Sequence, residues 1–238
     1  QELANEYLTE QGITILNDVT LNSVSNDGNK PVITANGQNY TFDAVLYATG
    51  RKPNTANIGL ENTDIATNER GAIVVNDTCE SSVPGVYAVG DVNGGPQFTY
   101  ISLDDFRIVF GTLTGNGQYT LKDRKNIPYT TFLTPPLARV GLTEEDAINK
   151  GYTVKTKEML VATMPRAHVN DYLKGAFKIV VNADNDLILG ATLYSQGAEE
   201  LINLIKMAMD NNIPYTYFKN QIFTHPTMAE NLNDLCNF

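Results

Sequence analysis

The stretch at residues 85–99, GVYAVGDVNGGPQFT, constrains the fold of this chain more than any other segment. Its apolar run at 86–89 is rich in strand-forming residues, and Gly90 and Asp91 follow it directly. This pattern predicts a buried strand that ends at a glycine turn and carries one carboxylate at its carboxyl end. Ligands of open α/β sheets bind at that edge. For AVGD alone, a buried strand followed by a solvated Asp91 is the simpler interpretation.

Two further segments change that interpretation. Residues 46–54, LYATGRKPN, place Arg51 after a glycine, and residues 224–230, THPTMAE, contain His225 and Glu230. Taken singly, Arg51 is a solvated turn residue and His225 a polar cap before a helix. In this order and at this spacing, however, the three segments resemble the motifs of the FAD-dependent pyridine nucleotide-disulfide oxidoreductases. This is the family of glutathione reductase, dihydrolipoamide dehydrogenase and mercuric reductase, and the resemblance covers essentially the whole chain.

The resemblance implies a fold that is α/β and α+β, in three parts. Residues 1–45 are expected to be the remnant of a nicotinamide-binding domain, and residues 46–120 the carboxyl-terminal part of an FAD-binding domain. Residues 121–238 are expected to form an α+β dimerisation domain, with an antiparallel sheet flanked by helices. The polar, glycine-containing stretch at 115–128 supports a boundary in this region.

The same resemblance implies the contacts to FAD. Asp91 would accept a hydrogen bond from a ribitol hydroxyl, and Gly90 would let the backbone come close to the cofactor. Thr99 would contact the flavin through its backbone amide, and the Arg51 guanidinium would lie near the pyrophosphate. Relatives often have T-P-V-A where this chain has TYIS at 99–102, which puts the shape of the pocket in question.

The carboxyl-terminal motif suggests an acid–base pair. Pro226 is typical of a first helical position, and Glu230 would then lie just over one turn into the helix, from where its carboxylate reaches back to His225. The resemblance implies that His225 exchanges protons with a redox dithiol and that Glu230 orients it. In the family this pair faces the flavin and disulfide of the other subunit, so we expect a homodimer.

The net charge excludes one class of partner. It is −10, from 27 acidic and 17 basic residues, and such a field repels a phosphate backbone, so we expect no nucleic-acid partner. The longest clean apolar run, at 44–48, is far shorter than the ~20 residues that cross a bilayer. No secretory signal is recognisable. We therefore expect no membrane partner and a cytoplasmic location.

The cysteines and the second histidine do not suggest a metal site. Cys79 and Cys236 lie far apart in sequence and form neither a CxxC nor a metal-ligand spacing, so each is interpreted as a small packing residue. His168 lies in a predicted loop at 164–168 without ligating neighbours, and we expect it to be exposed. No metal is expected.

The chain has no GxGxxG motif after a strand and no CxxxxC motif. In the family these elements bind FAD and the nicotinamide cofactor and carry the redox disulfide. We therefore expect this chain to be the carboxyl-terminal half of a larger reductase, which would use FAD, NADH or NADPH, and a disulfide or small oxidant substrate. QFTYISLDDFRIV at 97–109 resembles a branch that defends against reactive chlorine and thiocyanate oxidants. The alternative is a non-enzymatic dimerisation or scaffold module that has lost the redox centre.

Local patterns predict the remaining elements. The dipeptides Asp27-Gly28 and Asn36-Gly37 predict a three-stranded meander over 19–42. Thr143, followed by carboxylates, predicts a helix start. Further helices are expected at 1–12, 101–115 and 198–212, and further strands at 13–16, 44–50, 71–75, 152–163, 173–181 and 187–194.

Overall fold

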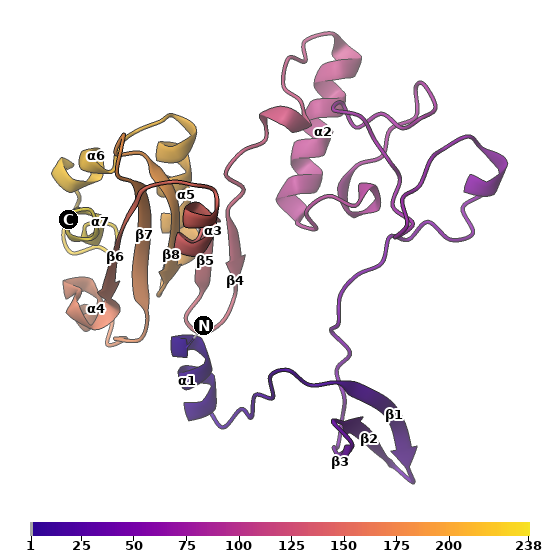
Figure 1. The fold of residues 1–238 in the computed structure, drawn as a ribbon, viewed down its shortest axis with the longest axis horizontal. Coiled ribbons are helices and arrows are strands. Elements are labelled where there is room, and N and C mark those ends of the chain that lie inside the picture. The colour runs from indigo at the N-terminus through magenta and orange to yellow at the C-terminus, as the bar shows by residue number, and fades with distance from the viewer. Residues whose placement is uncertain (1) are drawn as a thin grey trace. The chain divides into compact units, whose positions relative to one another are not determined.

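A computed structural model describes residues 2–238, which form two compact units (Figure 1). The first unit contains Arg124–Phe238 together with residues 2–7, and the second contains Leu8–Asp123. No helix within the described residues is both long and apolar enough to cross a membrane.

The first unit is built on a five-stranded antiparallel sheet in the order β4-β5-β8-β7-β6. The prediction of an antiparallel sheet flanked by helices is therefore confirmed. Its strands are β4 (Tyr129–Thr131), β5 (Leu137–Gly141), β6 (Val154–Leu160), β7 (Ala176–Asn182) and β8 (Ile188–Tyr194). Its helices are α3 (Glu144–Asn149), α4 (Pro165–Val169), α5 (Ala198–Asp210), α6 (Tyr215–Asn220) and α7 (Asn231–Leu235), with a 3₁₀ turn η4 at Val161–Thr163. Residues 164–168, predicted as a loop, are mostly helical because Pro165 starts α4 at its first turn.

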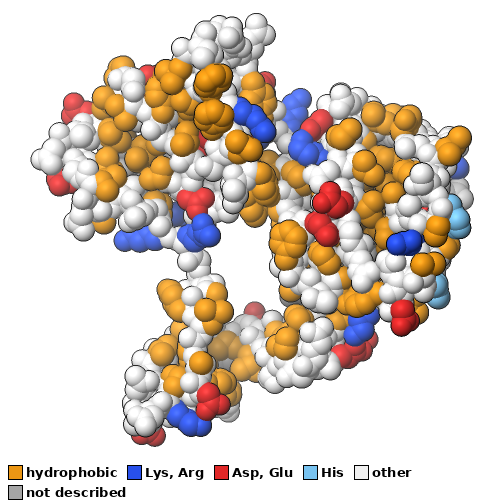
Figure 2. Space-filling view, turned by 180° about the vertical axis from the view of Figure 1, so that it is seen from behind, with side chains coloured by type: hydrophobic (Ala, Val, Ile, Leu, Met, Phe, Trp, Pro, Cys, Tyr) orange, Lys and Arg blue, Asp and Glu red, His pale blue; other side chains and the backbone are white. Residues whose placement is uncertain are grey.

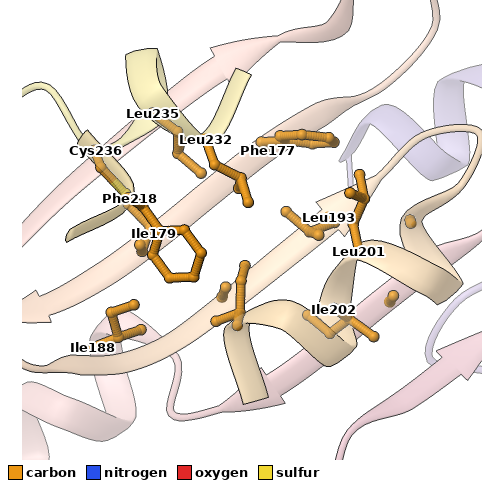
Figure 3. Close-up of a cluster of buried hydrophobic side chains, with 14 of the residues drawn as sticks. Phe177, Ile179, Ile188, Leu193, Leu201, Ile202, Phe218, Leu232, Leu235 and Cys236 are labelled. Carbon is orange, nitrogen blue, oxygen red and sulfur yellow. The ribbon is translucent and has the colours of Figure 1, made fainter. Parts of the chain in front are cut away.

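One continuous core holds this unit together (Figure 3). Alternate residues of β7, which are Phe177, Ile179 and Val181, are fully buried and lie on one face of the sheet. The helices α5, α6 and α7 cover that face with apolar side chains. The labelled contributors are Leu201 and Ile202 from α5, Phe218 from α6, and Leu232, Leu235 and Cys236 at the carboxyl end.

The ends of two helices are fixed by specific hydrogen bonds. Thr143 forms a capping box with Asp146, as its predicted N-cap role requires. Lys157 on β6 donates to the carbonyl oxygen of Asp234 at 2.8 Å and also to that of Asn237. The carbonyl groups at the end of α7 are thus satisfied by a cation, which the helix dipole favours. This contact ties the carboxyl-terminal segment to the sheet.

The second unit contains a three-stranded meander and one long helix. The meander consists of β1 (Leu21–Asp27), β2 (Lys30–Ala35) and β3 (Gln38–Thr41), as predicted. Asn36 and Gly37 both have positive φ angles and form the second turn. The first turn is one residue later than predicted, at Gly28 and Asn29, since Asp27 still pairs with Lys30. The other elements of this unit are α2 (Thr99–Thr114) and the 3₁₀ helices η1 (Leu60–Asn62), η2 (Gly90–Asn93) and η3 (Leu121–Asp123). The helix α1 (Glu2–Glu10) is divided between the two units, with Tyr7 in the first and Leu8 in the second.

Four predicted strands do not form as strands. Residues 13–16 and 44–50 are irregular, while the segments at 71–75 and 86–89 form only the isolated bridges Thr67–Ile73 and Glu80–Tyr87. A strand requires a neighbour that takes up its backbone N–H and C=O groups, and no further strand within residues 2–238 lies beside these segments. Consequently Leu46 and Tyr47, predicted to be covered on both faces, are 90% and 81% exposed.

The helix predicted at 101–115 is present as α2, which begins earlier, at Thr99, and Gly115 ends it in the left-handed conformation. Its buried face consists of Ile101, Asp105 and Ile108. Most of its other large apolar side chains are exposed, Val109 is half-buried, and Figure 2 shows hydrophobic atoms spread over the surface of this unit. The exposed residues are Tyr100, Leu103, Phe106, Phe110 and Leu113.

Candidate functional site

The structure brings Asp91 and Arg51 together, although they are far apart in sequence. Asp91 lies in η2, directly after Gly90, and an Arg51 guanidinium nitrogen donates to its Oδ2 at 2.6 Å. The Arg51 side chain is 68% exposed and the Asp91 side chain is 40% exposed. Because the pair is open to water, its contribution to stability is small. Both groups therefore remain accessible to a ligand.

Thr99 is the first residue of α2, so its backbone N–H has no acceptor within the helix. No side chain caps this end, and the Thr99 amide donates to no acceptor among the residues that the structure describes. An exposed helix N-terminus is a site for anions or carbonyl oxygens. The carboxylate of Asp91, the guanidinium of Arg51 and this amide form a donor and acceptor set that suits a ligand with hydroxyl and phosphate groups.

Sequence analysis did not identify Asp105, which contacts the same turn. Its carboxylate is fully buried and accepts hydrogen bonds from the Gly90 backbone N–H and from the Asn93 side chain. A signal was present in the sequence, because Asp105 lies between Ile101 and Ile108 on the face of α2 that the helical period places inward. A charged residue at such a position needs buried donors.

The side chains of His225 and Glu230 are also in contact, but the local structure is a turn and not the predicted helix start. The helix α7 begins at Asn231, with Glu230 as its N-cap, so Pro226 does not occupy a first helical position. Residues 224–230 instead form a compact turn in which Thr227 donates through its hydroxyl to the Thr224 carbonyl. This turn folds Glu230 back toward the imidazole without a helical repeat between them. Leu232 and Leu235 are buried and Met228 packs against the core, as the inward stripe required.

The geometry of the pair fixes the role of each imidazole nitrogen. Nδ1 of His225 lies 2.8 Å from Oε2 of Glu230, and the second carboxylate oxygen accepts from the Thr227 backbone N–H at 3.1 Å. A carboxylate partner places the proton of the neutral imidazole on Nδ1, which leaves Nε2 as the acceptor. The His225 side chain is 69% exposed, and Figure 2 shows histidine atoms at the surface of the unit with the five-stranded sheet. Nε2 is thus available to exchange a proton with an incoming group.

Glu230 should titrate below the ordinary value for a glutamate. The hydrogen bond with His225 lowers its pKa from 4.5, burial opposes this shift, and the Thr227 amide adds to the lowering. Because the folded-state pKa of Glu230 is depressed, its ionised carboxylate stabilises the folded protein above the unfolded-state pKa. This stabilisation is lost as the pH falls through the folded-state pKa.

We expect the Glu230 pKa to rise in His225→Gln, because the hydrogen bond that lowers it is then weakened. Carboxyl NMR titration measures it, and an unchanged value would contradict the hydrogen bond.

The cysteines and the second histidine do not form a second site with other groups that the structure describes. Burial raises the pKa of the Cys236 thiol to about 12, which makes it a poor nucleophile, and Cys79 is also buried. Within residues 2–238, no group of three or more His, Cys, Asp or Glu side chains could hold a metal ion. His168 is exposed, and its Nε2 lies 2.8 Å from the Ala162 carbonyl oxygen.

Comparisons with protein families match both units of the chain. Residues 127–236 match the family described as pyridine nucleotide-disulphide oxidoreductase, dimerisation domain. Residues 1–105 match the family described as pyridine nucleotide-disulphide oxidoreductase. The chain belongs to the pyridine nucleotide-disulfide oxidoreductase family. The resemblance found in the sequence motifs is thereby confirmed.

Individual members of the family resemble the chain over nearly its whole length. The probable pyridine nucleotide-disulfide oxidoreductase RclA of Escherichia coli is 44% identical over 96% of this chain and 52% of its own length. A mercuric reductase of Staphylococcus aureus is 36% identical, over 97% of this chain and 43% of its own length. The solved structure of HOCl-induced flavoprotein disulfide reductase RclA from Escherichia coli matches with a TM-score of 0.95 and 42% identity, covering 99% of this chain and 54% of that one. The chain thus spans about half the length of the relatives it matches.

Proposed function

We propose that this chain is part of a homodimeric FAD-dependent oxidoreductase, which passes electrons from NADH or NADPH to a disulfide or small oxidant substrate. The observation that carries the proposal is the 2.8 Å contact between His225 and Glu230, on a chain that belongs to a disulfide oxidoreductase family. A scaffold that had lost its chemistry would not need an oriented, exposed imidazole. The E. coli relative RclA is described as an HOCl-induced flavoprotein disulfide reductase, and this favours a small oxidant as the substrate of the present protein.

The residues of the second unit fit a flavin nucleotide. Asp91 would accept from a ribitol hydroxyl, Arg51 would turn toward the pyrophosphate, and the Thr99 amide would donate to the flavin. The Gly90 backbone, with a φ of +71°, lets the turn approach the cofactor closely. When bound, FAD supplies the electron transfer between the nicotinamide and the disulfide.

The His225–Glu230 pair would manage the protons of the reaction. Nε2 of His225 would take a proton from a thiol of the redox pair as its sulfur attacks the substrate, and would give that proton to the leaving group of the reduced substrate. Glu230 would hold the ring in the required tautomer and orientation. In a two-fold dimer this imidazole would face the dithiol of the partner subunit, so each site would need both chains.

Replacing Asp91 with alanine should weaken FAD binding in the longer protein by roughly ten- to hundredfold, because a charge-assisted hydrogen bond is lost. Flavin retained after dialysis, followed by its visible absorbance, measures the effect. Asp64→Ala is a matched control, because it removes an exposed carboxylate of the same unit and keeps the backbone carbonyl that accepts from the Ser82 hydroxyl. If flavin retention is the same in both variants, Asp91 does not hold the ribitol.

The chain should also sediment as a dimer at micromolar concentration. The match to the dimerisation domain covers residues 127–236, which is nearly the whole of the first unit. Sedimentation velocity measures the mass directly. A monomer that retains its far-UV circular dichroism would argue against the proposed assembly.

A further inference from the structure

We propose that Asp105 is a positioning residue for the flavin site. It holds the Gly90–Asn93 turn (η2) in a fixed position relative to the start of α2. The inference rests on the proposed function, since it concerns how Asp91 and Thr99 are presented to the cofactor. Asp105 itself lies too deep to be a ligand, because its side chain is fully buried.

The contacts of Asp105 fix the residue on each side of Asp91. Its Oδ2 accepts from the Gly90 backbone N–H at 2.7 Å and from Nδ2 of Asn93 at 2.9 Å. Hydrogen bonds to an ionised acceptor are shorter and stronger than neutral ones, and burial strengthens them further. One carboxylate oxygen therefore holds both ends of the turn that carries Asp91.

Asn93 extends this network through the rest of the loop. Its Nδ2 also lies 3.3 Å from the Ala88 carbonyl oxygen, and its Oδ1 accepts from the Gly95 backbone N–H at 3.0 Å. The segment from 88 to 95 is thus tied to α2 through a side chain fixed by Asp105. Without the contact between Asp105 and Asn93, the backbone of this segment would be less restrained, and the Asp91 carboxylate would move with it.

Close packing between the turn and the helix adds a second constraint. A Cβ atom at Gly90 would lie 2.9 Å from the Ser102 hydroxyl oxygen, so the helix approaches the backbone of the turn directly. Ser102 and Asp105 are one turn apart on α2 and face the same way. Because Thr99 opens this helix, Asp105 sets the distance between the Asp91 carboxylate and the Thr99 amide, which are the two groups that would contact the flavin.

The first test measures the anchor in the chain itself, by hydrogen exchange of single backbone amides. In Asp105→Ala the Gly90 amide should exchange at least about tenfold faster, because its acceptor is gone. Asp105→Asn keeps the shape of the side chain and one oxygen acceptor, so its Gly90 amide should exchange at a rate between those of Asp105→Ala and the unsubstituted chain. The Ile108 amide of α2 should be unaffected in both. Asp104→Asn removes the same charge from the adjacent residue of the helix and should change neither amide.

The second test is a double-mutant cycle on FAD affinity in the longer protein. If Asp105 acts through Asp91, Asp105→Ala should weaken FAD binding about tenfold, and the Asp91→Ala, Asp105→Ala double variant should be no weaker than Asp91→Ala alone. A residue that only stabilises the fold would give additive losses.

Three outcomes separate the two claims. If Asp91→Ala leaves flavin retention unchanged, the proposed function of the turn is wrong and the inference is wrong with it. If Asp91→Ala weakens binding but Asp105→Ala does not, the inference alone is overturned. Equal acceleration of the Gly90 and Ile108 amides in both Asp105 variants would also overturn it, since Asp105 would then merely keep α2 folded.

Discussion

His225→Gln is expected to slow turnover with the oxidant substrate by roughly 10²–10⁴-fold, the range for loss of a positioned acid–base group. Reduction of the enzyme by NADH or NADPH should keep its rate, because that step does not require the His225 proton. The physical basis is the fixed tautomer, in which Glu230 holds Nδ1 and leaves Nε2 exposed. Stopped-flow absorbance measures the two half-reactions separately.

The chain offers a matched control, since it contains two histidines and both are exposed. His168→Gln removes an imidazole whose Nε2 lies beside the Ala162 carbonyl oxygen and which contacts no carboxylate within residues 2–238, so it should leave turnover unchanged. Glu230→Gln should do less harm than His225→Gln, because it loosens the orientation of the ring without removing it. The limb of the pH–rate profile that is lost in His225→Gln should persist in His168→Gln. Equal slowing of both half-reactions in a folded His225→Gln protein would mean that His225 is only structural.

Phe177→Ala is expected to destabilise the first unit by about 3–5 kcal/mol, the usual cost of truncating a fully buried aromatic side chain. Phe177 is 0% exposed and pairs across the sheet with Met159 and Leu193. Because domains of this size are stable by only about 5–15 kcal/mol, the loss is a large share of the total. Urea unfolding followed by circular dichroism measures the change.

Phe132→Ala is the control for this substitution. It deletes the same atoms from a side chain of the same unit that is 78% exposed, so its effect should stay within about 0.5 kcal/mol. A similar loss of stability in both variants would contradict the assignment of the core to the β7 face that α5, α6 and α7 cover.

The first unit was predictable from the sequence because its signals are local and consistent. The strand-forming apolar runs of β7 and β8, the polar connection between them and the capping pattern at Thr143 each specify the same structure. The stripe of α5 faces the sheet as its period requires. In the second unit, Asn36-Gly37 likewise defined its turn correctly.

The predictions that failed depended on partners distant in sequence. Continuous apolar runs indicated strands at 44–50 and 86–89, but pairing, which decides whether a strand forms, is a non-local property. The contact between Arg51 and Asp91 was not predictable for the same reason, since only the fold places those side chains 2.6 Å apart. At His225 the motif predicted the contact with Glu230 but not the turn that forms it, because a proline signal does not distinguish a helix start from a preceding turn.

The unpaired run around Leu46 and Tyr47 has a consequence for the behaviour of this chain in solution. Exposed strand-forming residues with open backbone groups are a template for pairing with other copies, which promotes aggregation. In the unit that carries the run, the β1-β2-β3 sheet leaves Leu46 and Tyr47 exposed, whereas the other unit has a continuous core. On heating, the chain is therefore expected to precipitate through this segment before the five-stranded sheet melts, so the apparent melting temperature would depend on scan rate and protein concentration.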